Sequence, residues 1–420
     1  MTSKDNASRI YTLMKWMTSL ANATMFTTYA VYQVIAMGLN PLQLLLVGMV
    51  LEVTVLVFEG ITGVIADTYS RRLSVIVGMF VLGSGFVLEG SAMWLGSEVS
   101  LLSAFMWLLL SQVIFGLGAT FVSGAETAWS VDEVGEEHAG TIFMRAGRIG
   151  LSATLLGIAL SVGLSALEPN LPYVIGGFIY LLLGVILLVY MKETKFTKPQ
   201  PSAGASNWHR LTSTWLSGAK VIRSQPVLLM IVIVTLFSGA ASEGYDRLWQ
   251  AHLITDIGFP NSLALSAAVW FGTIALLSTL LSLGVMAFAE KRLNMGNEQV
   301  VLRGMFVLTL ARIGAIVSIA LAPNFVWALV SVLFFEAVRT LSGPIYDTWL
   351  NLNIESRSRA TVLSMMSQSD ALGQTAGGPL VGWVGKRFSL RTSLVAAAVL
   401  LVPILAVYGR TLRNRRERDS

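Results

Sequence analysis

Acidic and basic side chains stand close together inside two long apolar stretches of this sequence. Glu243, Asp246 and Arg247 share one stretch, and Glu336 and Arg339 share another. The spacing of four between Glu243 and Arg247 allows a salt bridge within one helical turn. A carboxyl group in such a setting can take up a proton from one side and release it to the other. The pattern therefore indicates that one of these acids binds a proton. The alternative is that the acids only neutralise the nearby arginines and hold helices together.

Two further acids, Glu52 and Glu59, lie seven residues apart in a third apolar stretch and so on one helical face. Arg312 and Asp370 interrupt two more stretches. An ionisable group at membrane depth costs about 2.5–3.5 kcal/mol on insertion scales, so each one asks for a functional reason. We predict that at least one carboxyl group carries a proton, and the candidates are Glu52, Glu59, Glu243, Asp246 and Glu336.

Polar and aromatic side chains in other apolar stretches are candidates for a binding cavity. Asn22, Tyr29 and Gln33 fall on one helical face, with Tyr32 beside it. Aromatic and amide groups suit a bulky, amphipathic ligand, although Tyr and Trp near helix ends also serve as interfacial anchors. The candidate cavity residues are Asn22, Tyr29, Tyr32, Gln33, Gln112, Tyr245, Trp249 and Arg339.

The sequence lacks the residues and motifs that metal binding, ATP hydrolysis and hydrolase catalysis require. The chain has no Cys and only three His, scattered at 138, 209 and 252, so we expect no metal site. No Gly-rich loop ends in Gly-Lys-Ser/Thr, and no hydrolase motif is present. We therefore expect no cofactor and no enzymatic activity.

The elements that position these residues are membrane-spanning helices. Hydrophobic residues make up 54% of the 420 residues and charged residues 13%, against about 25% charged in soluble domains. A spanning helix needs about 20 mostly apolar residues. Twelve segments meet this description: 11–37, 42–65, 73–94, 101–128, 140–166, 171–191, 226–250, 262–288, 300–322, 325–350, 361–385 and 390–408.

The predicted fold is an all-α integral membrane protein of twelve transmembrane helices in two pseudo-symmetric six-helix bundles. The bundles occupy 1–191 and 226–408, with a linker at 192–225 and a basic tail at 409–420. In the linker, apolar residues recur from Trp208 to Ile222 at spacings of three and four, which predicts an amphipathic interfacial helix.

The distribution of Lys and Arg predicts the orientation. Most of them fall on the side of the two termini, and only Lys386, Arg387 and Arg391 fall on the other side. Both termini are therefore expected in the cytoplasm. The net charge of +5 is explained by membrane orientation, and no nucleic-acid partner is expected.

One loop between the second and third stretches resembles the signature loop of the major facilitator superfamily. It carries Gly63, Ala66, Asp67, Arg71 and Arg72 at the positions of the family motif. The resemblance implies twelve helices, a central cavity lined by helices 1, 4, 7 and 10, and a conformational latch at this loop. Asp67 is expected to face the start of helix 11, near residues 361–364, with Gly63 allowing a close approach. Arg71 and Arg72 are expected to reach acids below helix 4, such as Glu126 or Asp132.

The sequence resembles most the bacterial drug:proton antiporters, including the macrolide and tetracycline efflux types, although Gln112 stands where the proton-linked Arg of that group occurs. The function predicted is secondary-active export of small amphiphilic molecules or drugs in exchange for protons, from the bacterial cytoplasmic membrane and as a monomer. The alternatives are an exporter or flippase of an endogenous lipid or siderophore, an uncoupled facilitator, and a transport-dead membrane sensor.

Overall fold

A computed structural model describes residues 3–96, 102–196, 223, 226–260, 264–292, 298–352 and 359–419. Over these ranges the chain forms helices and short connections, without strands. The predicted amphipathic helix around Trp208 lies outside the described residues.

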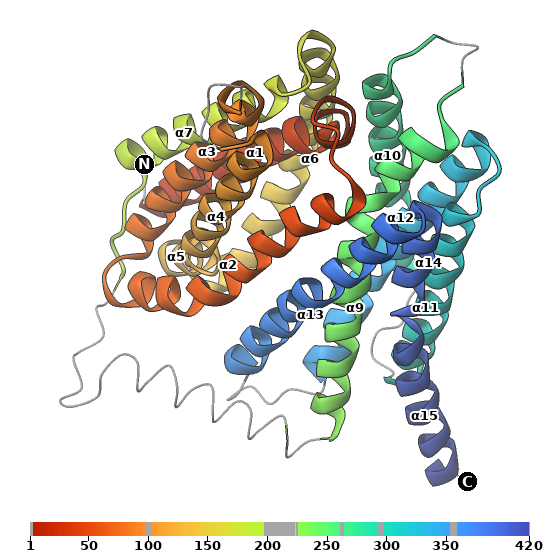
Figure 1. Cartoon of the computed structure of the whole chain (residues 1–420). Coiled ribbons are helices and arrows are strands. Elements are labelled where there is room, and N and C mark those ends of the chain that lie inside the picture. Colours follow the sequence, from red (N-terminus) through yellow and green to blue (C-terminus); the bar gives the residue numbers. More distant parts are fainter. Residues whose placement is uncertain are drawn as a thin grey trace. The chain divides into compact units, whose positions relative to one another are not determined.

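The first half of the chain contains the segments of the first predicted bundle (Figure 1). Its elements are α1 (Ser3–Phe26), the π-helix η1 (Val31–Ala36), α2 (Pro41–Thr68), α3 (Arg71–Leu95), α4 (Ala104–Val122), α5 (Ala125–Val134), α6 (Glu136–Leu167) and α7 (Leu171–Tyr190).

The second half repeats this pattern of long helices. Its elements are α9 (Pro226–His252), the π-helix η2 (Leu253–Ile257), α10 (Ala267–Arg292), α11 (Glu298–Ala320), α12 (Phe325–Leu352), α13 (Arg359–Arg387), α14 (Leu390–Val399) and α15 (Val402–Asp419).

Ten helical segments of the described chain are long and apolar enough to cross a membrane. The other two of the twelve, α1 and α13, are richer in Ser, Thr, Asn, Gln and Gly. The all-α membrane fold predicted from the sequence is confirmed.

Three predicted spans are not single regular helices. The segment 11–37 leaves regular α-helix after Phe26 and resumes as the π-helix η1. The segment 101–128 ends at Val122, because Gly124 takes a φ of +72° that L side chains rarely adopt, and α5 starts beyond it. The last span divides between α14 and α15, just before Pro403, and the predicted tail from 409 stays helical to Asp419.

Two compact units make up the chain. One contains α1, η1, α3 to α7 and α2 from Val50 onward, together with Ser266–Gly272. The other contains the remaining described elements of the second half and Asn40–Met49, which includes the first turns of α2. Each unit therefore includes one short stretch from the other predicted bundle: Ser266–Gly272 belongs to the first unit and Asn40–Met49 to the second.

Side-chain caps define several helix starts. Asn40 Oδ1 accepts a hydrogen bond from the Gln43 amide at 3.1 Å, and Gln43 Oε1 accepts one from the Asn40 amide at 3.0 Å. This reciprocal capping box, followed by Pro41, fixes where α2 begins. Ser70 caps α3 by accepting a hydrogen bond from Leu73 N.

Glycines allow helices within each unit to approach closely. In the second unit, a Cβ on Gly373 or Gly377 of α13 would overlap the α9 backbone at Leu236 or Ala240. Figure 1 shows α13 crossing α9 in this unit. In the first unit, a Cβ on Gly157 of α6 would lie 2.6 Å from the Ala23 side chain of α1. Small residues thus let the helices pack by close van der Waals contact, because apolar lipid provides no hydrophobic driving force between helices.

Candidate functional site

The signature loop joins α2, α3 and α5. Arg71, the first residue of α3, donates hydrogen bonds to Asp132 on α5 and, at 3.2 and 3.3 Å, to Asp67 on the last turn of α2. Asp132 is one of the two acids expected for the basic pair. The other, Glu126, is 2.6 Å from the ammonium group of Lys15 instead. Arg71 therefore bridges two carboxylates, and this bridge gives Asp67 a cationic partner at the negative end of its helix.

The Arg72 guanidinium binds main-chain carbonyls, and within the described ranges it makes no hydrogen bond to either predicted acid. It donates to Met191 O at 2.6 Å and to Leu188 O at 2.8 Å, at the end of α7. Ala66 is buried in the core of the same unit. Within this unit a Cβ on Gly63 would meet open space, so the close approach predicted there, which involves the other half, stays a prediction.

The chain segment that follows α7 is fastened to the same loop. Glu193 accepts hydrogen bonds from Ser70 Oγ at 2.6 Å and from the Arg72 amide at 3.1 Å. Glu133 of α5 accepts the amides of Thr194 and Lys195 at 2.5 and 2.9 Å. Residues 191–196, called here the docked segment, therefore belong structurally to the first unit.

A buried carboxylate, Glu89 of α3, accepts hydrogen bonds from two amide side chains of the first unit. Gln33 Nε2 donates to Glu89 Oε1 at 3.2 Å, and Gln112 Nε2 donates to Glu89 Oε2 at 3.0 Å. The Tyr32 hydroxyl donates to the Glu89 carbonyl at 2.7 Å. Three of the predicted cavity residues are thus buried around Glu89, an acid that is not among the predicted proton-binding residues.

The other predicted cavity residues of the first half have separate surroundings. Asn22 is exposed and accepts a hydrogen bond from the Tyr180 hydroxyl at 2.8 Å. Tyr29 is half-buried against the apolar core. The single face assumed for Asn22, Tyr29 and Gln33 is interrupted, because the helix breaks after Phe26. Glu52 and Glu59 are both half-buried on α2, and Glu59 accepts a hydrogen bond from Ser123 Oγ at 3.3 Å.

Ion pairs occupy the second half of α9. Glu243, which is 6% exposed, lies 3.0 Å from Arg247 Nε, as the spacing of four predicted. Asp246 is bound by both terminal nitrogens of Arg339 on α12, at 2.6 and 3.1 Å. A bidentate ion pair of this kind fixes the relative orientation of the two side chains as well as attracting them. The Arg339 side chain therefore ties α12 to α9.

Two glycines make room for Glu243. A Cβ on Gly48, in the part of α2 that belongs to the second unit, would overlap the Glu243 carboxylate. A Cβ on Gly378 of α13 would lie 3.3 Å from Glu243 Cγ. The carboxylate thus lies where α2, α9 and α13 meet.

The predicted aromatic lining on α9 packs partly into the core. Tyr245 is fully buried against Phe335 of α12, with ring centroids 3.8 Å apart, and it stacks on Trp249 at 6.3 Å. Glu336 is half-buried one residue beyond Phe335.

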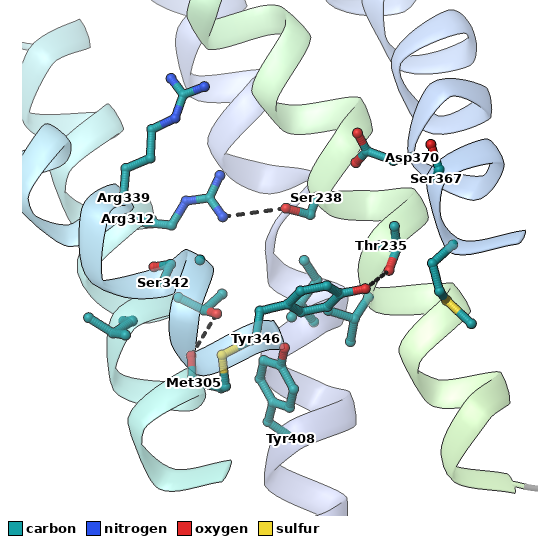
Figure 2. A pocket seen from close by; sticks show the side chains of 16 residues that line it. Thr235, Ser238, Met305, Arg312, Arg339, Ser342, Tyr346, Ser367, Asp370 and Tyr408 are labelled. Atoms are coloured by element: carbon teal, nitrogen blue, oxygen red, sulfur yellow. Dashed lines mark hydrogen bonds between the residues drawn. The ribbon is translucent and has the colours of Figure 1, made fainter. Parts of the chain in front are cut away.

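A cavity of about 480 Å³ opens within the second unit, between α9, α11, α12, α13 and α15. Figure 2 shows Arg312 pointing toward Ser238, with Asp370 on the neighbouring helix and Arg339 extending away from Tyr346 and Tyr408. Its polar lining consists of Thr235, Ser238, Thr309, Arg312, Arg339, Ser342, Tyr346, Ser367, Asp370 and Tyr408. Of these, only Arg339 was among the residues predicted for a cavity.

The family model described as Major Facilitator Superfamily matches residues 10–373. A curated relative, the uncharacterized MFS-type transporter YxaM of Bacillus subtilis (strain 168), is 26% identical over 371 residues, which cover 87% of this chain and 86% of that protein.

Solved structures share the fold at low sequence identity. A mutant of the nucleoside transporter NupG superposes with a TM-score of 0.75 at 14% identity and covers 96% of this chain and 99% of its own. A bacterial homolog of the human lysosomal transporter Spinster gives 0.72 at 15% identity, covering 98% of both chains. A D-xylose–proton symporter gives 0.67 at 13% identity, covering 97% of both chains. Because the family model matches most of its residues, the chain belongs to the Major Facilitator Superfamily and is a multi-pass membrane transporter.

Proposed function

We propose that this transporter exports small amphiphilic molecules from a bacterial cell in exchange for protons, by alternating access. The observation that carries the proposal is the bidentate ion pair between Asp246 on α9 and Arg339 on α12. It joins two helices that the family resemblance places at the central cavity, and its carboxylate is where we propose that the transported proton binds.

The proton and the arginine compete for the same carboxylate. When Asp246 is ionised, its two oxygens hold both terminal nitrogens of Arg339. A proton on Asp246 removes the negative charge and one acceptor site, so Arg339 is released and α12 can move relative to α9. Since the proton binds the two arrangements with different affinity, it shifts their populations.

We propose that protonation of Glu243 acts in the same way on the contacts of α9 with α2 and α13. Its carboxylate fills the space beside Gly48 and Gly378 and pairs with Arg247. Neutralising Glu243 weakens that local pair and alters a contact shared by three helices. We propose Glu243 and Asp246 as the coupling carboxylates, with Glu336, one turn from Arg339, as an accessory charge.

The signature loop supplies a second, conformational element. Arg71 holds Asp67 and Asp132 together at one end of the first unit. We propose that this cluster stabilises one access state, and that breaking it changes the rate of exchange between states and leaves substrate binding intact.

The setting we propose is the bacterial cytoplasmic membrane, with a monomer whose termini both face the cytoplasm. One solved structure of the same fold is named a D-xylose–proton symporter, which supports proton coupling on this scaffold. Export of drugs is supported by the signature loop and by a cavity that combines apolar and charged lining.

Transport into inverted membrane vesicles tests the proposal. An imposed inside-acid gradient should drive uptake of fluorescent amphiphilic dyes or antibiotics, and a protonophore should abolish it. Asp246→Asn and Glu243→Gln should lose gradient-driven uptake while retaining substrate exchange at equilibrium. Glu168→Gln, the same chemical change at an exposed residue after α6, is the matched control and should transport normally.

The alternatives give different results in the same assay. An uncoupled facilitator would equilibrate substrate regardless of the gradient. An exporter of an endogenous lipid or siderophore would ignore drugs but respond to those compounds. A transport-dead sensor would move nothing although folded. Gradient-driven uptake that survives in both carboxyl variants would refute the roles proposed for Glu243 and Asp246.

A further inference from the structure

The cavity of the second unit contains a cation whose hydrogen-bonding capacity is largely unused. Arg312 lies on α11, a helix that is long and apolar enough to cross a membrane, and its side chain lines the cavity. Among the described residues, its one hydrogen bond runs from Nη1 to Ser238 Oγ at 3.4 Å, longer than a usual N–H···O bond. Its Nε is buried and has no hydrogen-bond partner in the described ranges. A guanidinium carries five N–H donors, and only one of them is hydrogen-bonded within the described part of the chain.

Arg339 has a charged partner of its own, whereas the Asp370 carboxylate attracts Arg312 electrostatically without a hydrogen bond to it among the described residues. Arg339 is held by Asp246 at 2.6 and 3.1 Å. Asp370 accepts a hydrogen bond from Gln374 Nε2 at 2.8 Å. The guanidinium of Arg312 also lies 6.0 Å from the Phe335 ring, a contact that leaves its N–H edge free to bind.

A second unused donor lines the same cavity. The Tyr408 hydroxyl of α15 is fully buried, and no hydrogen-bond partner for it is found among the residues that the structure describes. Its neighbour Tyr346 is already bonded to Thr235, with the two oxygens 2.5 Å apart. Figure 2 shows Arg312 and Tyr408 approaching the cavity from two different helices. Buried donors without acceptors are costly, and two of them at one cavity call for a ligand rich in acceptor atoms.

The remaining lining is apolar. Much of the wall is formed by aliphatic and methionine side chains: Val234, Met305, Leu308, Met366 and Ile404. The volume of about 480 Å³ falls within the range of small-molecule sites. The cavity thus combines a hydrophobic wall with a guanidinium and a phenol at one place.

We infer that this cavity is a substrate site for amphiphilic anions, with Arg312 binding the oxyanion and Tyr408 donating a second hydrogen bond. The oxyanion is a carboxylate or a phosphate, and the apolar body of the molecule lies against the methionines and aliphatic residues. This inference rests on the proposed transport function, because it names the substrate class of that transporter.

Binding to the purified full chain in lipid nanodiscs tests the inference without any gradient. The fluorescent probes are 1-naphthoate and 1-naphthyl phosphate, with neutral 1-naphthamide and cationic 1-naphthylmethylamine as comparisons. Both anions should bind at least tenfold more tightly than the neutral and cationic probes. A preference between the two anions identifies the oxyanion as carboxylate or phosphate.

Substitutions then assign the residues. Arg312→Gln should weaken anion binding about tenfold or more, as expected for losing charge-assisted hydrogen bonds. Tyr408→Phe should weaken it about threefold to tenfold, as for one neutral hydrogen bond. Arg303→Gln removes the same charge from an exposed position on the same helix and should bind like the parent.

Equal binding of the cation or the amide overturns the inference, as does unchanged naphthoate affinity in Arg312→Gln. If Arg312→Gln does not yield folded protein, naphthoate binding to Arg312→Lys and to Tyr408→Phe tests the inference instead. The lysine keeps the charge without the planar fork, so weaker naphthoate binding in both variants supports the site, and parental affinity in both overturns it. Proton-driven uptake in vesicles is measured separately, so loss of anion binding and loss of coupling are distinguishable failures.

Discussion

The ion pair between Asp246 and Arg339 allows a quantitative prediction, because it joins two helices through a defined geometry. The perturbation is a double-mutant cycle: Asp246→Asn, Arg339→Gln and the combination. In the parent, Arg339 Nη1 lies 2.6 Å from Asp246 Oδ1 and Nη2 lies 3.1 Å from Oδ2. The asparagine and glutamine keep much of the shape while removing each charge.

The expected coupling lies between those of exposed and buried ion pairs. Two unit charges 3 Å apart attract by roughly 5 kcal/mol at an effective dielectric constant of 20. The two side chains are 48% and 36% exposed, however, and exposed pairs contribute only about 0.2–1 kcal/mol. We therefore expect a coupling free energy of about 1–2 kcal/mol, within the usual range for residues in contact.

The assay is equilibrium unfolding of the four proteins in mixed detergent micelles, with the coupling taken from the free energies of unfolding. A control cycle pairs Asp246→Asn with Arg303→Gln, which lies exposed on α11 and should give a coupling near zero. The exchanged variant Asp246→Arg with Arg339→Asp should recover part of the loss. A coupling below about 0.5 kcal/mol, or one equal to the control cycle, would refute the view that this pair ties α12 to α9.

Three further predictions concern packing, the buried acid and the docked segment. Gly377→Ala should lower the free energy of unfolding by about 1–3 kcal/mol, since its Cβ would overlap the α9 backbone, whereas Gly284→Ala, which meets open space, should not; similar stabilities would contradict the packing described. Glu89→Gln should lower the unfolding temperature, because two amide donors lose a charged acceptor worth about 1.5–3 kcal/mol; an unchanged melting curve counts against that network. Glu133→Gln should speed hydrogen exchange of the Thr194 amide about tenfold, and equal exchange rates would show that the carboxylate does not hold this segment.

The fold was predictable because lipid imposes a length and a composition on each segment. Each of the twelve predicted spans overlaps a helix of the structure. The breaks within them were not predictable from hydropathy. At Gly124 the chain turns because of a left-handed backbone conformation, and after Phe26 it changes helix type, while both places remain embedded in apolar sequence.

The site was predictable only where contacts are local. Glu243 and Arg247 are four residues apart, so helical periodicity alone brings them together. Asp246 and Arg339 are 93 residues apart, and periodicity does not define which helix faces which. Glu89 carried the same signal as the predicted acids, a carboxylate within an apolar stretch, and applying that criterion to every stretch would have found it.

The docked segment has a consequence for how the chain folds as it is synthesised. Residues 191–196 follow the last helix of the first bundle, yet they supply the carbonyl for Arg72, the carboxylate for Ser70 and the amides for Glu133. The first unit therefore cannot complete its closing contacts when α7 enters the membrane. It must wait until these six residues leave the ribosome. A fragment ending at Met191 should accordingly be less stable than one ending at Phe196, and the later end point is where the two halves are best separated for co-expression.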